Sequence, residues 1–196
     1  YNALQKRAFL SPRNILVDDF NNRILNDLPG ITHTYFTQLT HPGIPNHELN
    51  LKSGAICSIM RNISIEKGLV KNSRVMITKL GRRLIEVTLL NNNQPNHTLE
   101  TCLLPRINFY FQPDHCSWTV YRKQFPLRLA YSTTFNSSQG LTLDRIIIDL
   151  RTHVFAHGQL YTAISRVKNK DDCLILLPES NTTAKTVNIV YKELIQ

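Results

Sequence analysis

A single arginine near the end of a predicted helix is the first residue whose type and position suit chemistry. Apolar residues at helical spacing predict a helix over 155–167, with Leu160, Ala163, Ile164 and Val167 on one face. Arg166 lies on the opposite side of this helix, together with Gln159 and Thr162. A guanidinium in that place can bind a phosphate, or it can complement the helix dipole or pair with a carboxylate. The pattern alone leaves these alternatives open.

A polar loop gives the arginine a candidate context. Residues 133–144 read TTFNSSQGLTLD, a concentration of hydroxyls and amides around one glycine, between two strand-like runs. Short polar side chains and free backbone N–H groups suit phosphate oxygens, and open α/β sheets bind ligands at the carboxyl ends of their strands. The alternative is a well-capped turn with no ligand.

The elements that must position these residues begin with a helix near the amino end. Ser11-Pro12 predicts its cap and first turn, and Val17, Phe20, Ile24 and Leu28 recur on one face. Pro29-Gly30 ends it, and the stretch 32–40 is predicted to be extended.

The middle of the chain has the texture of short strands. Five runs separated by turn-like sequences predict an antiparallel β-module: 55–60, 74–78, 84–90, 99–104 and 118–121. A small barrel is expected, because closure removes exposed strand edges.

The last third returns to alternating strand and helix. Strands are predicted at 127–131, 146–149 and 173–177, and the helix over 155–167 separates the last two. Strand, helix, strand is a βαβ unit and favours a parallel sheet. We therefore predict a discontinuous α/β domain of residues 1–45 and 122–196, interrupted by a β-rich insert of residues 46–121.

Composition limits the partners. A formal charge of +9 and a pI near 9.6 favour a polyanion such as nucleic acid, although a basic surface without a partner has the same signature. The four cysteines lack zinc-ribbon spacing, so no metal site is predicted, and neither is a membrane span or a signal peptide. The chain begins at Tyr1 without a start methionine, which suggests a fragment.

Two segments in order resemble the closing motifs of the petite-integration-frequency (PIF) helicases, especially the form fused to Helitron transposable elements. YSTTFNSSQGLTLD, residues 131–144, resembles the family's fifth helicase motif, and VFAHGQLYTAISRV, residues 154–167, resembles its sixth. The likeness extends over most of the chain: residues 11–30 resemble the start of the second RecA-like domain, 43–77 the inserted 2B domain, 123–132 the approach to motif five and 187–195 the natural tail.

The resemblance implies a fold and roles for individual residues. The fold is an α/β, RecA-like (P-loop NTPase-type) parallel sheet that lacks the P-loop itself and carries the inserted antiparallel barrel. Arg166 is then the catalytic arginine finger, which reaches the γ-phosphate of ATP and contributes about 10³ to 10⁵ in rate. Gln139 and Gly140 would lie beside ATP. The residues implied in DNA binding are Thr134, Asn136, Ser138, Asn62, Asn72 and Arg74.

Departures from the family pattern are few. Ser137 stands where the family usually has a lysine before Ser-Gln-Gly, which removes a cation from the DNA side of the loop. Ser73 replaces the threonine of the insert's Asn-Gly-Thr-Arg stretch, and with Lys71 ahead of Asn72 the glycine of that stretch is missing too.

No Gly-Lys dipeptide occurs, so the chain has no Walker A loop, and no Walker B acidic pair follows an apolar strand. We therefore expect ATP and Mg²⁺ to act in a full-length 5′-to-3′ helicase, and this chain alone to hold neither and to be inactive. The expected partners are single-stranded DNA and the missing N-terminal RecA-like domain, in the nucleus or the mitochondrion. The alternatives are a stand-alone nucleic-acid-binding module and a decayed transposon relic. Upstream Walker motifs in the genomic frame would distinguish these alternatives from the enzyme.

Overall fold

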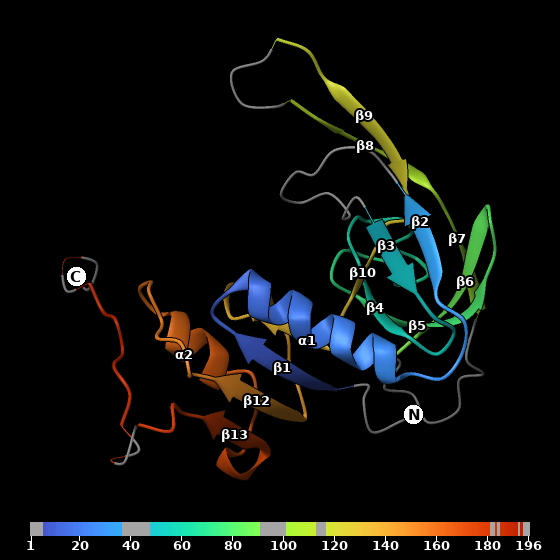
Figure 1. Ribbon diagram of the computed structural model, residues 1–196. Coiled ribbons are helices and arrows are strands. Elements are labelled where there is room, and N and C mark those ends of the chain that lie inside the picture. Colours follow the sequence, from blue (N-terminus) through green and yellow to red (C-terminus); the bar gives the residue numbers. More distant parts are fainter. Residues whose placement is uncertain are drawn as a thin grey trace. The chain divides into compact units, whose positions relative to one another are not determined.

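The computed structural model describes residues 6–36, 48–90, 101–112, 117–180, 183, 185–191 and 193. The chain divides into two compact units (Figure 1). Tyr1–Arg23 with Tyr131–Gln196 form what we call the α/β unit, and Ile24–Ala130 form the β unit. Among the described residues, no helix is both long and apolar enough to cross a membrane.

The α/β unit contains a parallel sheet of four strands. Its order is β11 (Ser132–Thr134), β1 (Arg7–Ser11), β12 (Arg145–Asp149) and β13 (Cys173–Leu176). The connection from β12 to β13 holds α2 (Gln159–Ile164) and the short 3₁₀ turn η3 (Lys170–Asp172). This confirms the predicted βαβ unit, because parallel neighbours need a crossover rather than a hairpin.

Helix α2 is shorter than the helix predicted over 155–167. It begins only after Gly158, whose φ of 67° is in the left-handed region, and Ser165 caps its other end. Leu160 and Ala163 are buried in the core of the unit, beside Phe135 and Ile148. Ile164, which the apolar stripe placed in this core, is 44% exposed.

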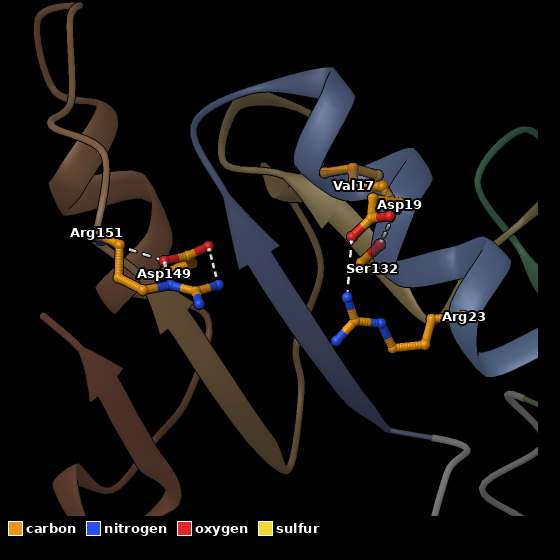
Figure 2. Close-up of polar contacts among 6 residues, drawn as sticks. All are labelled: Val17, Asp19, Arg23, Ser132, Asp149 and Arg151. Carbon is orange, nitrogen blue, oxygen red and sulfur yellow. Dashed lines mark hydrogen bonds and ion pairs between the residues drawn. The ribbon is translucent and has the colours of Figure 1, made fainter. Parts of the chain in front are cut away.

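Helix α1 (Asn14–Asp27) confirms the first predicted helix and fixes the position of β11. The helix begins at Asn14 rather than at Pro12, because Ser11 is still the last residue of β1. The Ser132 N–H donates to Asn21 Oδ1 at 2.9 Å. Ser132 Oγ donates to the Val17 carbonyl at 2.8 Å (Figure 2). Backbone and side chain of Ser132 are both satisfied by α1, so the start of the polar loop has a fixed anchor.

The β unit is antiparallel. Five strands follow the order β10 (Leu127–Leu129), β4 (Ile56–Ile59), β5 (Arg74–Leu80), β6 (Leu84–Leu89) and β7 (Thr101–Pro105). Two separate pairs accompany them: β2 (His33–Phe36) with β3 (Glu48–Leu51), and β8 (Ile107–Phe111) with β9 (Val120–Gln124). The pairing among the described residues runs from β10 to β7 without closing, so the barrel stays a prediction.

The five runs predicted as strands correspond to β4, β5, β6, β7 and β9. The strand predicted at 127–131 for the α/β domain was placed wrongly, because β10 pairs antiparallel with β4. An apolar run does not reveal its pairing partner, and Leu127 is as buried here as it would be in a parallel sheet. The compact units change over at 23/24 and 130/131. The predicted domain bounds at 45/46 and 121/122 stay a prediction.

Candidate functional site

Arg166 follows α2 and lies against the polar loop, residues 133–144. Its main-chain carbonyl accepts a hydrogen bond from Leu143 N–H at 2.9 Å. Its guanidinium donates to the Thr162 carbonyl at 2.8 Å through Nε, to the carbonyls of Leu141 at 3.1 Å and Ser138 at 3.5 Å through Nη1, and to Ser165 Oγ at 2.7 Å through Nη2. The arginine therefore links helix α2 to the loop that precedes β12.

All of these acceptors are neutral. The partners that the described part of the chain gives Arg166 are three carbonyls and one hydroxyl. Its side chain is only half-buried, so solvent reaches the positive charge. A guanidinium held by neutral acceptors keeps its charge uncompensated and can exchange them for a phosphate, which binds it more strongly.

The polar loop is held by short local bonds at its start. Ser137 N–H donates to Thr134 Oγ1 at 3.3 Å, and that hydroxyl donates to Ser137 Oγ at 2.9 Å. Ser138 is fully buried and its hydroxyl donates to the Phe135 carbonyl at 2.6 Å. These bonds support the 3₁₀ turn η2 (Asn136–Ser138), which the main-chain bond from Ser138 N–H to the Phe135 carbonyl forms, and the Phe135 side chain is completely buried.

The exposed residues of the loop are Asn136, Gln139, Gly140, Thr142 and Asp144, and the first three lie at its 3₁₀ turn or directly after it. Gly140 has a φ of +82°, which side chains other than glycine adopt only with strain, although a Cβ there would meet no atom within 4 Å. The positive φ at this position therefore favours glycine, and the space beside Gly140 is open. Asn136 and Gln139 present their amides to solvent there, whereas Ser138 turns its hydroxyl inward.

The loop runs from the end of the sheet where the parallel strands finish to the opposite end, where they begin. It begins at the carboxyl end of β11, where Thr134 pairs with Ser11, and ends at the amino end of β12. Arg166 bonds the loop near that second end, through Leu143. Only the start of the loop therefore lies at the carboxyl end of a strand, where open α/β sheets bind ligands, because β11 and β12 flank β1 and need a crossover.

The three candidate residues of the β unit all have structural partners. Asn62 Oδ1 accepts from Lys71 N–H at 2.8 Å, and Asn72 Oδ1 accepts from Arg128 Nη2 at 3.3 Å. Arg74 is buried and its Nη2 donates to the Ala130 carbonyl at 2.9 Å. Asn72 has a φ of 70°, a conformation that asparagine tolerates better than most residues, so it can stand in a stretch that lacks the family's glycine. Any contact of these residues with DNA stays a prediction.

One ion pair in the α/β unit was not predicted. Asp149, the last residue of β12, is completely buried, and Arg151 Nε and Nη2 donate to its two oxygens at 2.9 and 3.0 Å (Figure 2). The hydrogen bonds and the charge of Asp149 raise the pKa of the Arg151 guanidinium, and partial burial opposes this. The apolar run before Asp149 was a signal for a strand-end carboxylate, but nothing in the spacing identified its partner.

A second unpredicted contact joins the tail to the start of α2. The Tyr191 N–H donates to His157 Nδ1 at 2.9 Å, and the two rings stack with centroids 5.5 Å apart. The Gly158 N–H also donates to the Ile189 carbonyl at 3.2 Å. These contacts join residues far apart in sequence, so no local pattern could predict them.

No described group of three or more His, Cys, Asp or Glu side chains is arranged to hold a metal ion. Cys57, Cys102 and Cys173 are free thiols.

Comparison with known proteins gives a consistent result. Residues 35–80 match the family model described as DNA helicase Pif1, 2B domain. The ATP-dependent DNA helicase PIF1 of Homo sapiens is 30% identical over 176 residues, which is 80% of this chain and 25% of that protein. For the Xenopus laevis protein the figures are 29% over 175 residues, 82% and 26%. The chain thus spans about a quarter of the length of these relatives.

Solved structures agree. The crystal structure of Bacteroides Pif1 bound to ssDNA superposes with a TM-score of 0.70 at 25% identity, over 96% of this chain and 44% of that one. Pif1 helicase from Candida albicans gives a TM-score of 0.69 at 24% identity, over 87% and 45%.

The parallel sheet, with α2 and Arg166 behind it, and the antiparallel unit together have the RecA-like fold of these Pif1 helicase structures. With the matches in sequence, this shows that the chain belongs to the Pif1 helicases and supports its assignment to their C-terminal part.

Proposed function

We propose that this chain is the C-terminal portion of an ATP-dependent DNA helicase that translocates 5′ to 3′ on single-stranded DNA. ATP and Mg²⁺ are held by the N-terminal RecA-like domain of the same polypeptide, and this chain supplies motifs five and six. The observation that carries the proposal is the neutral clamp of Arg166 on the polar loop.

In this proposal the clamp couples nucleotide to DNA. To reach a γ-phosphate, the guanidinium must exchange its bonds to the Ser138 and Leu141 carbonyls for phosphate oxygens. The loop then loses the guanidinium bonds and keeps only the bond from Leu143 N–H to the Arg166 carbonyl. The exposed amides of Asn136 and Gln139 can then shift along the DNA strand. Gln139 and Gly140 lie next to the nucleotide, and Thr134 and Asn136 follow the DNA phosphates. Ser138, whose hydroxyl and N–H both donate to the Phe135 carbonyl, comes into contact with the phosphates only if this turn opens.

The β unit contributes a second DNA contact through Asn62, Asn72 and Arg74. The human relative is named an ATP-dependent DNA helicase, which supports the activity. The Bacteroides relative was crystallised bound to ssDNA, which supports the partner. The net charge of +9 supports a phosphate-rich ligand as well.

ATP hydrolysis after reconstitution tests the proposal. The chain is fused behind the ATP-binding half of the human relative, and turnover is measured with and without single-stranded DNA. Arg166→Ala is expected to lower kcat by about 10³ or more, because an arginine finger acts on transition-state charge. The matched control is Arg145→Ala, since Arg145 forms only a surface ion pair of 3.4 Å with Asp172. Equal turnover by the two variants would refute the proposal, and so would turnover by the chain alone that Arg166→Ala abolishes.

A second candidate is a nucleic-acid-binding module without ATP chemistry. The bond between Ser137 and Thr134 favours it, because the loop closes on itself without the family's cation. A reconstituted protein that binds single strands but never hydrolyses ATP would support this candidate.

A further inference from the structure

The β8–β9 ribbon in the β unit has two unlike faces. Strand pairing places Tyr110 opposite Tyr121 and Asn108 opposite Lys123 on one face. The alternate residues Phe109, Arg122 and Gln124 lie on the other face and are almost completely buried. Figure 1 shows the ribbon extending beyond the other strands of the β unit.

The buried face accounts for how the ribbon is held. Gln124 Nε2 donates to the Tyr35 carbonyl at 3.2 Å, and its Oε1 accepts from Phe125 N–H at 3.0 Å. Arg61 lies over the Phe109 ring, 5.4 Å from its centroid. The packing of Phe109 and the hydrogen bonds of Gln124 therefore hold the ribbon without the two tyrosines.

The opposite face leaves two aromatic rings in solvent. Tyr110 is 61% exposed and Tyr121 is 73% exposed. Their ring centroids are 6.0 Å apart and the rings are tilted by 55°. A neighbouring pair of exposed rings contributes little to the core, yet it offers flat π surfaces that bases stack on.

The charged residues of the β8–β9 ribbon indicate which kind of ligand the two tyrosines would bind. Residues 105–112 and 117–125 contain no Asp or Glu. Of their three cations, Arg122 is buried on the other face and Arg106 lies over the Phe125 ring, so Lys123 is the cation beside the tyrosines. Lys123 is exposed and lies two residues from Tyr121 on the same face, about 6.5 Å along the strand. Aromatic rings beside a cation, with no carboxylate in these two segments, fit a base followed by its phosphate better than an apolar peptide.

We propose that the Tyr110–Tyr121 face is a stacking platform for the bases of a single-stranded nucleic acid, and that Lys123 binds an adjoining phosphate. This platform is a site additional to the polar loop, and its binding requires neither Arg166 nor ATP. Because every base has a π face, the platform binds without strong sequence preference.

Binding by the full chain tests this directly. Fluorescence anisotropy measures the Kd for a labelled thymidine oligomer and for an abasic strand of equal length. The pair of substitutions Tyr110→Ala and Tyr121→Ala is expected to weaken thymidine binding about tenfold and to leave abasic binding unchanged, since stacking needs bases. Tyr110→Phe with Tyr121→Phe is expected to stay within about twofold, because it keeps both rings.

The salt dependence of binding distinguishes the contribution of Lys123 from that of the two tyrosine rings. Lys123→Gln is expected to reduce the slope of log K against log salt by about 0.7, the share of one single-strand phosphate contact, whereas the alanine pair leaves the slope unchanged. Leu103→Ala is the matched control, because Leu103 is a 58% exposed apolar residue on β7 of the same unit. It is expected to change nothing.

Photocrosslinking with iododeoxyuridine strands needs no substitution, so it covers the case in which the alanine pair unfolds. Crosslinks at Tyr110 or Tyr121 are expected. The proposal is overturned by crosslinks only in residues 133–144, by equal affinity for thymidine and abasic strands, by no binding at all, or by phenylalanine variants as weak as alanine ones. ATP turnover depends on Arg166 and not on these rings, so this proposal and the proposed function fail separately.

Discussion

Arg166 should stabilise the isolated chain even though no nucleotide is present. Its Nη1 bonds to the Leu141 and Ser138 carbonyls are long-range contacts, whereas its bonds to Thr162 and Ser165 are local. A hydrogen bond from a charged donor contributes about 1.5–3 kcal/mol when buried, and water partly replaces this one because Arg166 is half-exposed. The 3.5 Å bond to Ser138 is weak, so we expect Arg166→Ala to cost about 1–2 kcal/mol.

The Leu143 amide reports this loss. Its N–H donates to the main-chain carbonyl of Arg166, which alanine retains. If the side chain holds the loop on α2, hydrogen exchange at Leu143 accelerates about 5- to 30-fold in Arg166→Ala, the factor that corresponds to about 1–2 kcal/mol. Exchange resolves this even when the two compact units unfold in separate transitions.

Arg145→Ala is the control for this measurement. Its ion pair with Asp172 is at the surface and contributes below about 1 kcal/mol, so Leu143 exchange should stay within about twofold. Unchanged exchange at Leu143 in Arg166→Ala would refute the reasoning, because the guanidinium would then not be holding the loop.

Three further outcomes follow from the contacts. Ser137→Lys should tighten single-strand binding and steepen the salt slope by about 0.7, because it restores the cation; an unchanged slope would contradict a DNA-facing loop. Asp149→Asn should lower the free energy of unfolding by about 1–3 kcal/mol in urea titrations, since the fully buried side chain loses its charge and one of the two oxygens that accept from Arg151; a change below about 0.5 kcal/mol, the usual scatter of surface substitutions, would contradict this. Burial raises the pKa of the Cys57 thiol well above its usual range, so iodoacetamide at about pH 8 should modify half-buried Cys173 before Cys57, by mass spectrometry; equal rates would argue against a closed core.

Helices and strands were predicted from the sequence better than the pairing of strands into sheets. Helix α1 and strand β12 follow from local periodicity, and both are found close to their predicted bounds. The helix over 155–167 was overextended, because the left-handed backbone at Gly158 interrupts it. The strand at 127–131 was assigned to the wrong sheet, since its apolar residues suit either one.

The candidate site was predictable as a set of residues and not as an arrangement. Residue type and spacing singled out Arg166 and the polar loop, motif resemblance implied their roles, and the structure brings them into contact. The inward turn of Ser138 depends on the Phe135 carbonyl, a backbone acceptor that no side-chain pattern reveals. The Tyr110–Tyr121 pair was missed for a related reason, because cross-strand register decides which side chains share a face.

The central claim is that Arg166 acts on ATP held by another domain. Single-turnover hydrolysis by the reconstituted protein, at saturating ATP and single-stranded DNA, tests it with Arg166→Ala in the presence and absence of added guanidinium. We predict a fall in rate of about 10³ or more with little change in ATP affinity, and partial recovery with guanidinium. An Arg166→Ala protein that hydrolyses ATP at the unsubstituted rate would contradict the claim.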